Sequence, residues 1–299
     1  MSSDLSWRLL QGIKERAIAE GEAIAETYGF LKPPVNPFRI IERERLIVPF
    51  GADFSTAFDG RLEYQAPRFL LFYNTKYDQW THGGEHHPKV IFTAAHELAH
   101  FFTDEHRDYL RRGGGPHRSF AEFASDSVVE QQADSFASGL LMPSHILRQT
   151  INEDSEVTLD FLKEVRATYE VPLVSMLVRW TQLSDFPCAT ICLSPNGVIA
   201  WGFVSEGFAR GGIFKALRGA VASSQNAHRF VAAEPTLGKY REAVADGYAD
   251  HWLDTSRRRL SVRENYVAIP YRRQAFVFVT ASEDEIADAS GWHLRDCDD

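Results

Sequence analysis

The sequence predicts an α+β fold, on three observations. Apolar residues recur at helical spacing over residues 6–28 and in several later segments. Residues 59–64 and 68–74 are strand-like runs on either side of a turn that contains Pro67, which predicts a small antiparallel sheet. After Asp185 the sequence changes to paired strand-like segments, which predicts a further α/β unit. With 44% hydrophobic and 24% charged residues, the 299-residue chain can bury a substantial core.

The elements of the first part follow from prolines and apolar spacing. Residues 6–28 form an amphipathic helix, and the three prolines within residues 31–38 end it. Farther along, Pro88 suits the first turn of a helix, because its missing N–H costs nothing there. The other elements expected here are a short helix opened by Asn36-Pro37, a strand over residues 45–50 ended by Pro49, a helix over residues 89–106, a glycine-rich break over residues 111–120 and a helix over residues 126–141.

Helical segments over residues 144–182 and then strands complete the chain. Val171-Pro172 marks a turn between two of these helices. Asn196-Gly197 stands between two apolar runs and is a strong hairpin signal. The other elements expected are strands over residues 188–194, 198–205, 265–270 and 274–280, a helix over residues 211–224, and a long polar and helical region after that helix.

Charge and hydropathy argue against several classes of protein. The formal net charge of -9 is unfavourable for general nucleic-acid binding, which depends on neutralising phosphates. No run approaches the about 18 apolar residues of a membrane helix, and the N-terminus lacks the apolar stretch of a signal peptide. Three cysteines are too few for a disulfide framework, so Cys188 and Cys192 are expected to be reduced, buried thiols. We therefore expect a cytoplasmic protein without direct DNA binding or membrane association.

The segment AAHELAH, residues 94–100, carries the strongest functional signal. His96 and His100 are four residues apart, so both imidazoles project from one face of a helix and can bind one zinc ion. Glu97 lies about 100° around the helix, near enough to take a proton from a water molecule at the metal without ligating it. The helix is strongly apolar, and a metal would remove the cost of burying these three polar side chains. The alternative is a chance match on an ordinary helix.

A second helix offers the missing ligand. A catalytic zinc site uses three protein ligands and keeps one open position. Glu130 and Asp134 are four residues apart and share a face of the helix expected over residues 126–141. The Glu130 carboxylate could complete a His-His-Glu site, while Asp134 accepts a hydrogen bond from the outer nitrogen of a ligating histidine. The alternative is that both are solvent-facing charges.

Two segments together resemble the ImmA/IrrE family of metallo-endopeptidases. FTAAHELAHFF matches the family's apolar lead-in to HE-L-x-H, and EQQADSFASGLLMP matches its E-x-x-A-N/D-x-F-A followed by L-L-M-P. DGRL and the strand that ends at Asn74 also stand in the family's usual order. The resemblance covers about residues 15–182. This chain departs from the pattern at Ala99, where glycine is common, and in a longer segment from Thr103 to Ser127.

The resemblance implies a gluzincin-like peptidase core with zinc ligands at His96, His100 and Glu130 and the general base at Glu97. Known members cleave helix-turn-helix transcriptional repressors, which releases genes for stress responses or mobile-element transfer. In radiation-response members a helical segment and a GAF-like domain follow the core, and the layout here is similar. We therefore expect a zinc metallopeptidase domain over residues 1–152, a helical, helix-turn-helix-like segment over residues 153–184, and a C-terminal α/β sensor or partner-binding domain over residues 185–299.

Weaker candidates accompany this site. The strand from Phe69 to Asn74, with Leu71 and Tyr73, could be an edge that pairs with an extended substrate, or it could be an ordinary sheet strand. A donor for the developing oxyanion is expected, and the sequence does not choose among Tyr109, His106, His117 and His145. In the C-terminal unit, the aromatic residues that could line a small-ligand pocket, or be plain core, are Trp201, Phe203, Tyr266, Tyr271 and Phe276.

The sequence thus predicts a zinc endopeptidase of narrow specificity, with one zinc ion per chain and a helix-turn-helix repressor as its substrate. The main alternative is a regulatory binding protein whose zinc is structural or vestigial and which sequesters its partner. Glu97 favours the enzyme, because a purely structural site has no use for a base beside the metal. A DNA-binding regulator is disfavoured by the acidic balance and by the single arginine in the apolar segment VPLVSMLVRWTQL.

Overall fold

Two compact units make up the chain. The computed structural model describes residues 2–81, 83–115, 118–119, 127–150, 157–234, 237–255, 259–270 and 273–290. One unit holds residues 1–155 and 163–176, and the other holds residues 156–162 and 177–299. Each combines helices with a sheet, so the predicted α+β class is confirmed. Among the described residues, no helix is long and apolar enough to cross a membrane.

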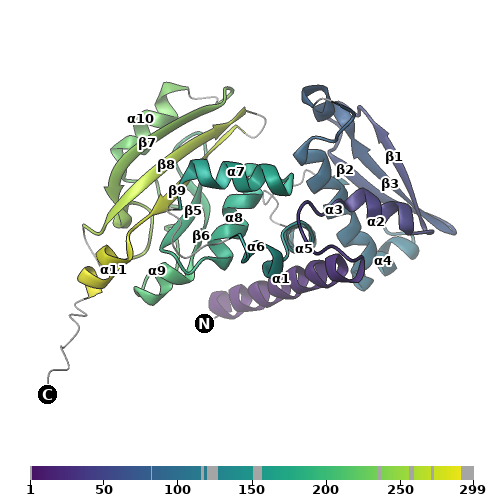
Figure 1. Cartoon of the computed structure of the whole chain (residues 1–299), viewed down its shortest axis with the longest axis horizontal. Coiled ribbons are helices and arrows are strands. Elements are labelled where there is room, and N and C mark those ends of the chain that lie inside the picture. Colours follow the sequence, from purple (N-terminus) through teal and green to yellow (C-terminus); the bar gives the residue numbers. More distant parts are fainter. Residues whose placement is uncertain are drawn as a thin grey trace, which may run out of the picture. The chain divides into compact units, whose positions relative to one another are not determined.

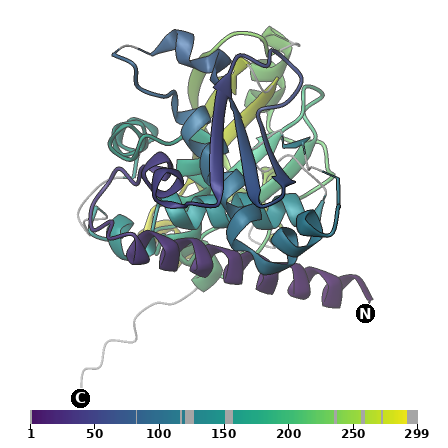
Figure 2. The same ribbon diagram turned by 90° about the vertical axis from the view of Figure 1, so that its right-hand side faces the viewer.

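The first unit is layered, with a sheet, α3, α5 and α1 in that order (Figures 1 and 2). α3 contacts β2 and β3 on one side and α5 on the other, and α5 packs on α1. The elements are α1 (Ser2–Thr27), α2 (Pro37–Arg43), β1 (Ile47–Ala52), β2 (Gly60–Gln65), β3 (Arg68–Asn74), the 3-10 helix η1 (Thr75–Trp80), α3 (Pro88–Phe102), α4 (Asp104–Arg111), β4 (Arg118–Ser119), α5 (Val128–Leu141) and α6 (Ser144–Leu147). α7 (Leu159–Tyr169) and α8 (Leu173–Leu183) contribute residues to both units.

The sheet of the first unit has the order β1-β3-β2-β4. β2 and β3 pair antiparallel, as predicted, but β1 pairs parallel to β3, so the sheet is mixed. The expectation that Pro49 ends its strand was wrong, because β1 continues through Pro49 to Ala52. β1 lies at the edge of the sheet, and an edge strand tolerates a residue that has no N–H to donate.

Two glycines bring α1 and α5 into close contact. A Cβ atom at Gly21 would lie 2.2 Å from the carbonyl oxygen of Phe136, and one at Gly139 would lie 2.2 Å from that of Ile18. The two backbones therefore approach at a distance that no side chain at either position would permit. Because α5 carries Glu130 and Asp134, this crossing fixes the helix from which both carboxylates project.

The second unit is built on a five-stranded antiparallel sheet with the order β6-β5-β9-β8-β7. The predicted hairpin at Asn196-Gly197 joins β5 to β6 and is confirmed. A core of buried side chains, including Trp252 and Phe208, lies against this sheet. The elements are β5 (Cys188–Leu193), β6 (Ile199–Val204), α9 (Glu206–Arg210), α10 (Gln225–Ala233), β7 (Arg241–Tyr248), the 3-10 helix η2 (Ala249–His251), β8 (Ser261–Ile269), β9 (Gln274–Thr280) and α11 (Glu283–Ser290).

The expectation of a helix over residues 211–224 was wrong. Helices lie on either side of this range, α9 before it and α10 after it, and the range itself is a loop. Gly212 and Gly219 adopt positive φ angles of 79° and 81°, which a regular helix does not contain. β7 was not predicted as a strand, since that region was expected to be polar and helical.

The cysteines and several of the aromatic residues singled out in the second unit are buried. Cys188 and Cys192 are buried and form no disulfide bond within the described residues, and burial raises the pKa of the Cys188 thiol to about 11. Tyr266 and Phe276 are buried, which is the plain-core alternative for these two residues. Trp201 and Phe203 are half-buried, and Tyr271 lies outside the described residues. The GAF-like assignment stays a prediction.

Candidate metal centre

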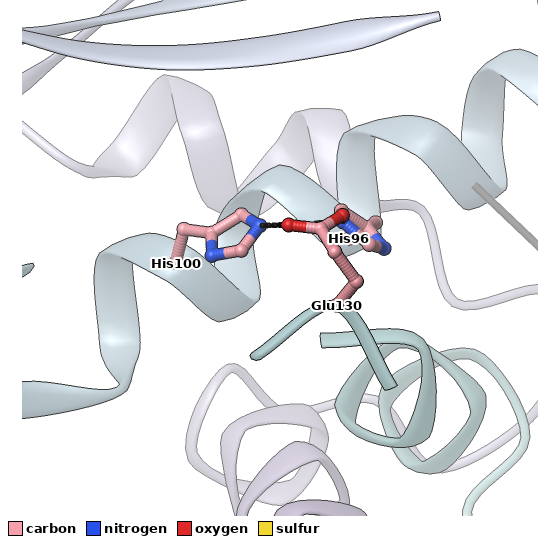
Figure 3. A group of neighbouring side chains, drawn as sticks. All are labelled: His96, His100 and Glu130. Carbon is pink, nitrogen blue, oxygen red and sulfur yellow. Dashed lines mark hydrogen bonds and ion pairs between the residues drawn. The ribbon is translucent and has the colours of Figure 1, made fainter. Parts of the chain in front are cut away.

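α3 carries the first two candidate ligands on a fully buried stretch. The helix begins at Pro88, and the His87 imidazole before it accepts a hydrogen bond from the Lys89 N–H at 3.2 Å. His96 and His100 are each 1% exposed, and their Nε2 atoms lie 3.2 Å apart (Figure 3). The four-residue spacing therefore brings the two imidazoles together, as the sequence predicts.

α5 brings Glu130 to the same point. One carboxylate oxygen lies 3.2 Å from His96 Nε2, and the other lies 3.7 Å from His100 Nε2. The ligand atoms of the three residues all lie within 4.8 Å of one another, on two helices that pack together (Figure 3).

These three side chains fit a tetrahedral zinc ion. Two nitrogens bonded to such an ion at about 2.0–2.1 Å would be about 3.3 Å apart. The observed separation of 3.2 Å between the Nε2 atoms of His96 and His100 agrees with this value. Two imidazoles and one carboxylate are a donor set that zinc accepts, and they leave one of four positions for a non-protein ligand.

Each imidazole also has a partner at its outer nitrogen. His96 Nδ1 lies 2.9 Å from Asp134 Oδ1, the arrangement predicted for Asp134. His100 Nδ1 lies 3.0 Å from His106 Nδ1, a contact that the sequence did not predict. If His100 binds a metal through Nε2, its Nδ1 carries the proton and donates to His106. Both rings are then fixed in the tautomer that leaves Nε2 available.

The contact with His106 depends on where α3 ends. The helix was expected to continue through residue 106, but it ends at Phe102, and Thr103 is extended before α4 begins. The turn at Thr103 directs His106 back towards His100, where it is 6% exposed. A continuous helix would have placed residues six apart on different faces.

The electrostatics of the centre favour a positive charge. Burial acts to lower the pKa of His96, but hydrogen bonds with Asp134 and Glu130 outweigh it and raise that pKa to about 10. The Glu97 carboxylate acts in the same direction. A buried site with this many carboxylates suits a divalent cation.

Glu97 projects towards the sheet, against the first residue of β2. Its side chain is fully buried, and a Cβ atom at Gly60 would lie 2.4 Å from its Oε1. The start of β2 therefore approaches this carboxylate closely. Gly60 was not a predicted site residue, although it belongs to the DGRL segment that stands in the family's usual order.

The predicted role of the strand from Phe69 to Asn74 as a substrate edge was wrong. β3 is hydrogen-bonded to β1 on one side and to β2 on the other, so it has no open edge. Phe69 and Leu71 are fully buried, Tyr73 packs its ring on Phe38, and Asn74 is 1% exposed. The alternative of an ordinary sheet strand holds for all four residues.

The structure also distinguishes among the residues that were candidate donors for the oxyanion. Tyr109 and His145 are exposed on α4 and α6, and His117 lies outside the described residues. His106 contacts the outer nitrogen of His100, so it is placed to orient that ring.

Comparison with known proteins agrees with this geometry. Residues 84–181 match the peptidase family described as IrrE N-terminal-like domain, a range that includes every residue of the centre on α3 and α5. The resemblance to the ImmA/IrrE family is therefore confirmed over these residues. A solved structure of a Mycobacterium tuberculosis transcriptional regulator has a similar fold, with a TM-score of 0.53, 13% identity, and coverage of 94% of this chain and 81% of that chain. No curated protein matches the chain.

Proposed function

We propose that this protein is a zinc-dependent endopeptidase of narrow specificity that cleaves a helix-turn-helix transcriptional repressor in the cytoplasm. Its action would derepress stress-response or mobile-element genes. The observation that carries the proposal is the cluster of the buried His96 and His100 with the partly buried Glu130, with their ligand atoms within 4.8 Å of one another. The buried Glu97 lies beside the two histidines on α3.

Each residue of the centre has a distinct role in the proposed reaction. A zinc ion held by His96, His100 and Glu130 would lower the pKa of a bound water towards about 7 and polarise the peptide carbonyl. Glu97 then accepts the proton of the attacking water and delivers it to the amine of the leaving half of the substrate. Asp134 and His106 keep the two imidazoles in the ligating orientation.

The choice of substrate is supported by likeness to other proteins. The family resemblance implies repressor cleavage, and the similar solved structure is described as a transcriptional regulator, although that likeness is one of fold. We propose that the second unit acts as a sensor or partner-binding domain. The centre itself lies entirely on helices of the first unit.

Replacement of Glu97 by Gln tests catalysis. The purified protein is mixed with helix-turn-helix regulators encoded beside its gene, with zinc and with a chelator. We expect the wild-type protein to cleave one regulator in a zinc-dependent manner, and Glu97→Gln to reduce the rate by roughly 10²–10⁴-fold because the general base is lost. Binding of zinc and of the regulator should be retained.

The matched control is Glu26→Gln, an exposed substitution of the same kind on α1, which should cleave like the wild type. Undiminished biological activity of Glu97→Gln would instead support the alternative function, sequestration of a partner without proteolysis.

A further inference from the structure

One face of α3 is formed by Lys89, Thr93 and Glu97, which follow one another at four-residue spacing. The start of β2 lies against this face. A Cβ atom at Gly60 would lie 2.4 Å from Glu97 Oε1 and 2.6 Å from Thr93 Cγ2. Because real Cβ atoms do not approach other atoms below 3.0 Å, no side chain fits at Gly60 with Glu97 in its present position.

The requirement for glycine comes from space and not from backbone angles. Gly60 is paired in the sheet with Tyr73, and its φ lies outside the positive range that L-residues avoid. Alanine could therefore adopt the same backbone conformation. The strain of an added methyl group would fall on the Glu97 carboxylate and on Thr93.

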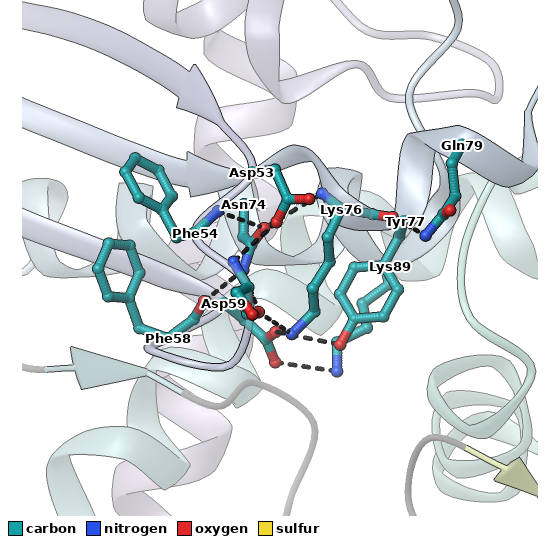
Figure 4. A network of polar contacts seen from close by, with 10 residues as sticks. Asp53, Phe54, Phe58, Asp59, Asn74, Lys76, Tyr77, Gln79 and Lys89 are labelled. Carbon is teal, nitrogen blue, oxygen red and sulfur yellow. Dashed lines mark hydrogen bonds and ion pairs between the residues drawn. The ribbon is translucent and has the colours of Figure 1, made fainter.

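A buried ion pair joins the residue before β2 to α3 and keeps the start of β2 close to that helix. Asp59, which precedes Gly60, forms an ion pair with Lys89 at 2.9 Å, and the two side chains are 5% and 7% exposed (Figure 4). Asp59 also accepts a hydrogen bond from the Tyr77 hydroxyl at 3.2 Å and lies 3.5 Å from the Lys76 ammonium. Removing one partner of such a pair would leave a buried charge uncompensated.

Asn74 holds the loop that precedes Gly60, residues 53–59. Its backbone N–H donates to the Asp59 carbonyl at 2.8 Å, and its side-chain amide donates to the carbonyls of Phe58 and Ser55 at 2.7 Å and 3.0 Å. Its side-chain oxygen accepts from the Phe54 N–H at 3.1 Å (Figure 4). The loop that delivers Gly60 is thus held through polar contacts at several points.

We propose that Gly60 is a positioning residue for Glu97. The missing side chain at Gly60 sets the place of the Glu97 carboxylate, and the ion pair between Asp59 and Lys89 keeps β2 close enough to enforce it. This inference rests on the proposed function in that Glu97 is the general base. The physical contact that it describes can be tested without any substrate.

The first test measures coupling in the zinc-loaded protein. A methyl group at position 60 would collide with both Glu97 and the Cγ2 methyl group of Thr93. Thr93→Ser removes the Cγ2 methyl group, so the collision of Gly60→Ala is then with Glu97. In the Thr93→Ser protein we expect Gly60→Ala to lower Tm by about 3–10 °C through overpacking. In the Thr93→Ser protein that also carries Glu97→Ala, most of this decrease should disappear. Equal decreases with and without the Glu97 side chain would overturn the proposal.

Crystal structures of the zinc-loaded Thr93→Ser protein with and without Gly60→Ala show the displacement directly. The Glu97 carboxylate should move by about 1 Å, the difference between the present 2.4 Å and an ordinary contact of 3.4 Å or more. An unmoved carboxylate with a shifted β2 would contradict the positioning role.

The second test measures kinetics with the regulator that the wild type cleaves. A misplacement of about 1 Å at a reacting group can reduce the rate roughly 100-fold, so Gly60→Ala with Thr93→Ser should lower kcat by about that factor relative to Thr93→Ser alone. KM and the zinc Kd should not change. Gln65→Ala, an exposed substitution at the end of β2, is the control and should leave all three values unchanged.

The two proposals can fail separately. If no regulator is cleaved or Glu97→Gln has no effect, the proposed function fails, while the melting and crystallographic results still decide the role of Gly60. If Glu97→Gln is inactive but Gly60→Ala shows no coupling to Glu97, the positioning proposal fails and the proposed function stands.

Discussion

At the scale of single residues, the candidate centre depends on what lies behind the two imidazoles. Asp134 contacts the outer nitrogen of His96, and His106 contacts that of His100. Fixing both rings in this way removes rotational freedom that a metal would otherwise have to restrict.

Asp134→Ala is predicted to weaken zinc binding by roughly 10–100-fold, because His96 loses the acceptor that orients its ring. Competition between the metal-free protein and a chelating dye measures the affinity. Asp108→Ala, on the exposed face of α4, serves as the control and should bind zinc like the wild type. An Asp134→Ala protein with unchanged affinity would show that the contact does not support the metal.

The residues of the site differ in how far the sequence could predict them. His96, His100, Glu130 and Asp134 were predicted because four-residue spacing on a helix translates directly into a shared face. Gly60 was not, because its role arises from tertiary contact between segments 37 residues apart, and neither segment alone indicates the other. The DGRL segment, already noted for the family's usual order, was the available signal.

At the scale of elements, the crossing of α1 and α5 connects helix packing to the site. Gly21 and Gly139 allow the two backbones to approach, and α5 presents Glu130 and Asp134 on the side that faces α3. A small separation of the helices would therefore move one ligand relative to the two on α3.

Gly21→Ala is predicted to destabilise the protein by about 1–3 kcal/mol, because its methyl group would collide with the backbone of α5. In a chain of this size that corresponds to a fall in Tm of roughly 2–10 °C, measurable by thermal unfolding. Gly12→Ala is the matched control in the same helix, where a Cβ atom would meet nothing within 4 Å. It should be neutral or stabilise by about 0.5–1 kcal/mol, since alanine favours helix more than glycine does. A lower Tm for Gly12→Ala than for Gly21→Ala would contradict this account of the crossing.

Elements with a strong local pattern were predicted, and those shaped by their neighbours were not. The hairpin at Asn196-Gly197 and the buried helix α3 have such patterns. β7 is largely exposed along its length at the edge of its sheet, so its sequence lacks the alternation that indicates a half-buried strand. The parallel pairing of β1 with β3 likewise depends on a non-local partner.

At the scale of the whole molecule, the α+β class followed from composition and periodicity, while the strand orders of the two sheets required the structure. The two compact units do not coincide with the three predicted parts, because α7 and α8 each contribute residues to both units. The division into residues 1–152, 153–184 and 185–299 therefore remains a prediction, and the proposed catalytic residues all belong to the first unit.

The most direct test of the central claim is anomalous X-ray diffraction at the zinc edge from crystals of the zinc-loaded protein. We predict one zinc peak per chain, about 2.0–2.2 Å from Nε2 of His96, Nε2 of His100 and a carboxylate oxygen of Glu130, with a non-protein ligand in the fourth position. A zinc ion bound elsewhere, or one enclosed by four protein side chains, would contradict the account.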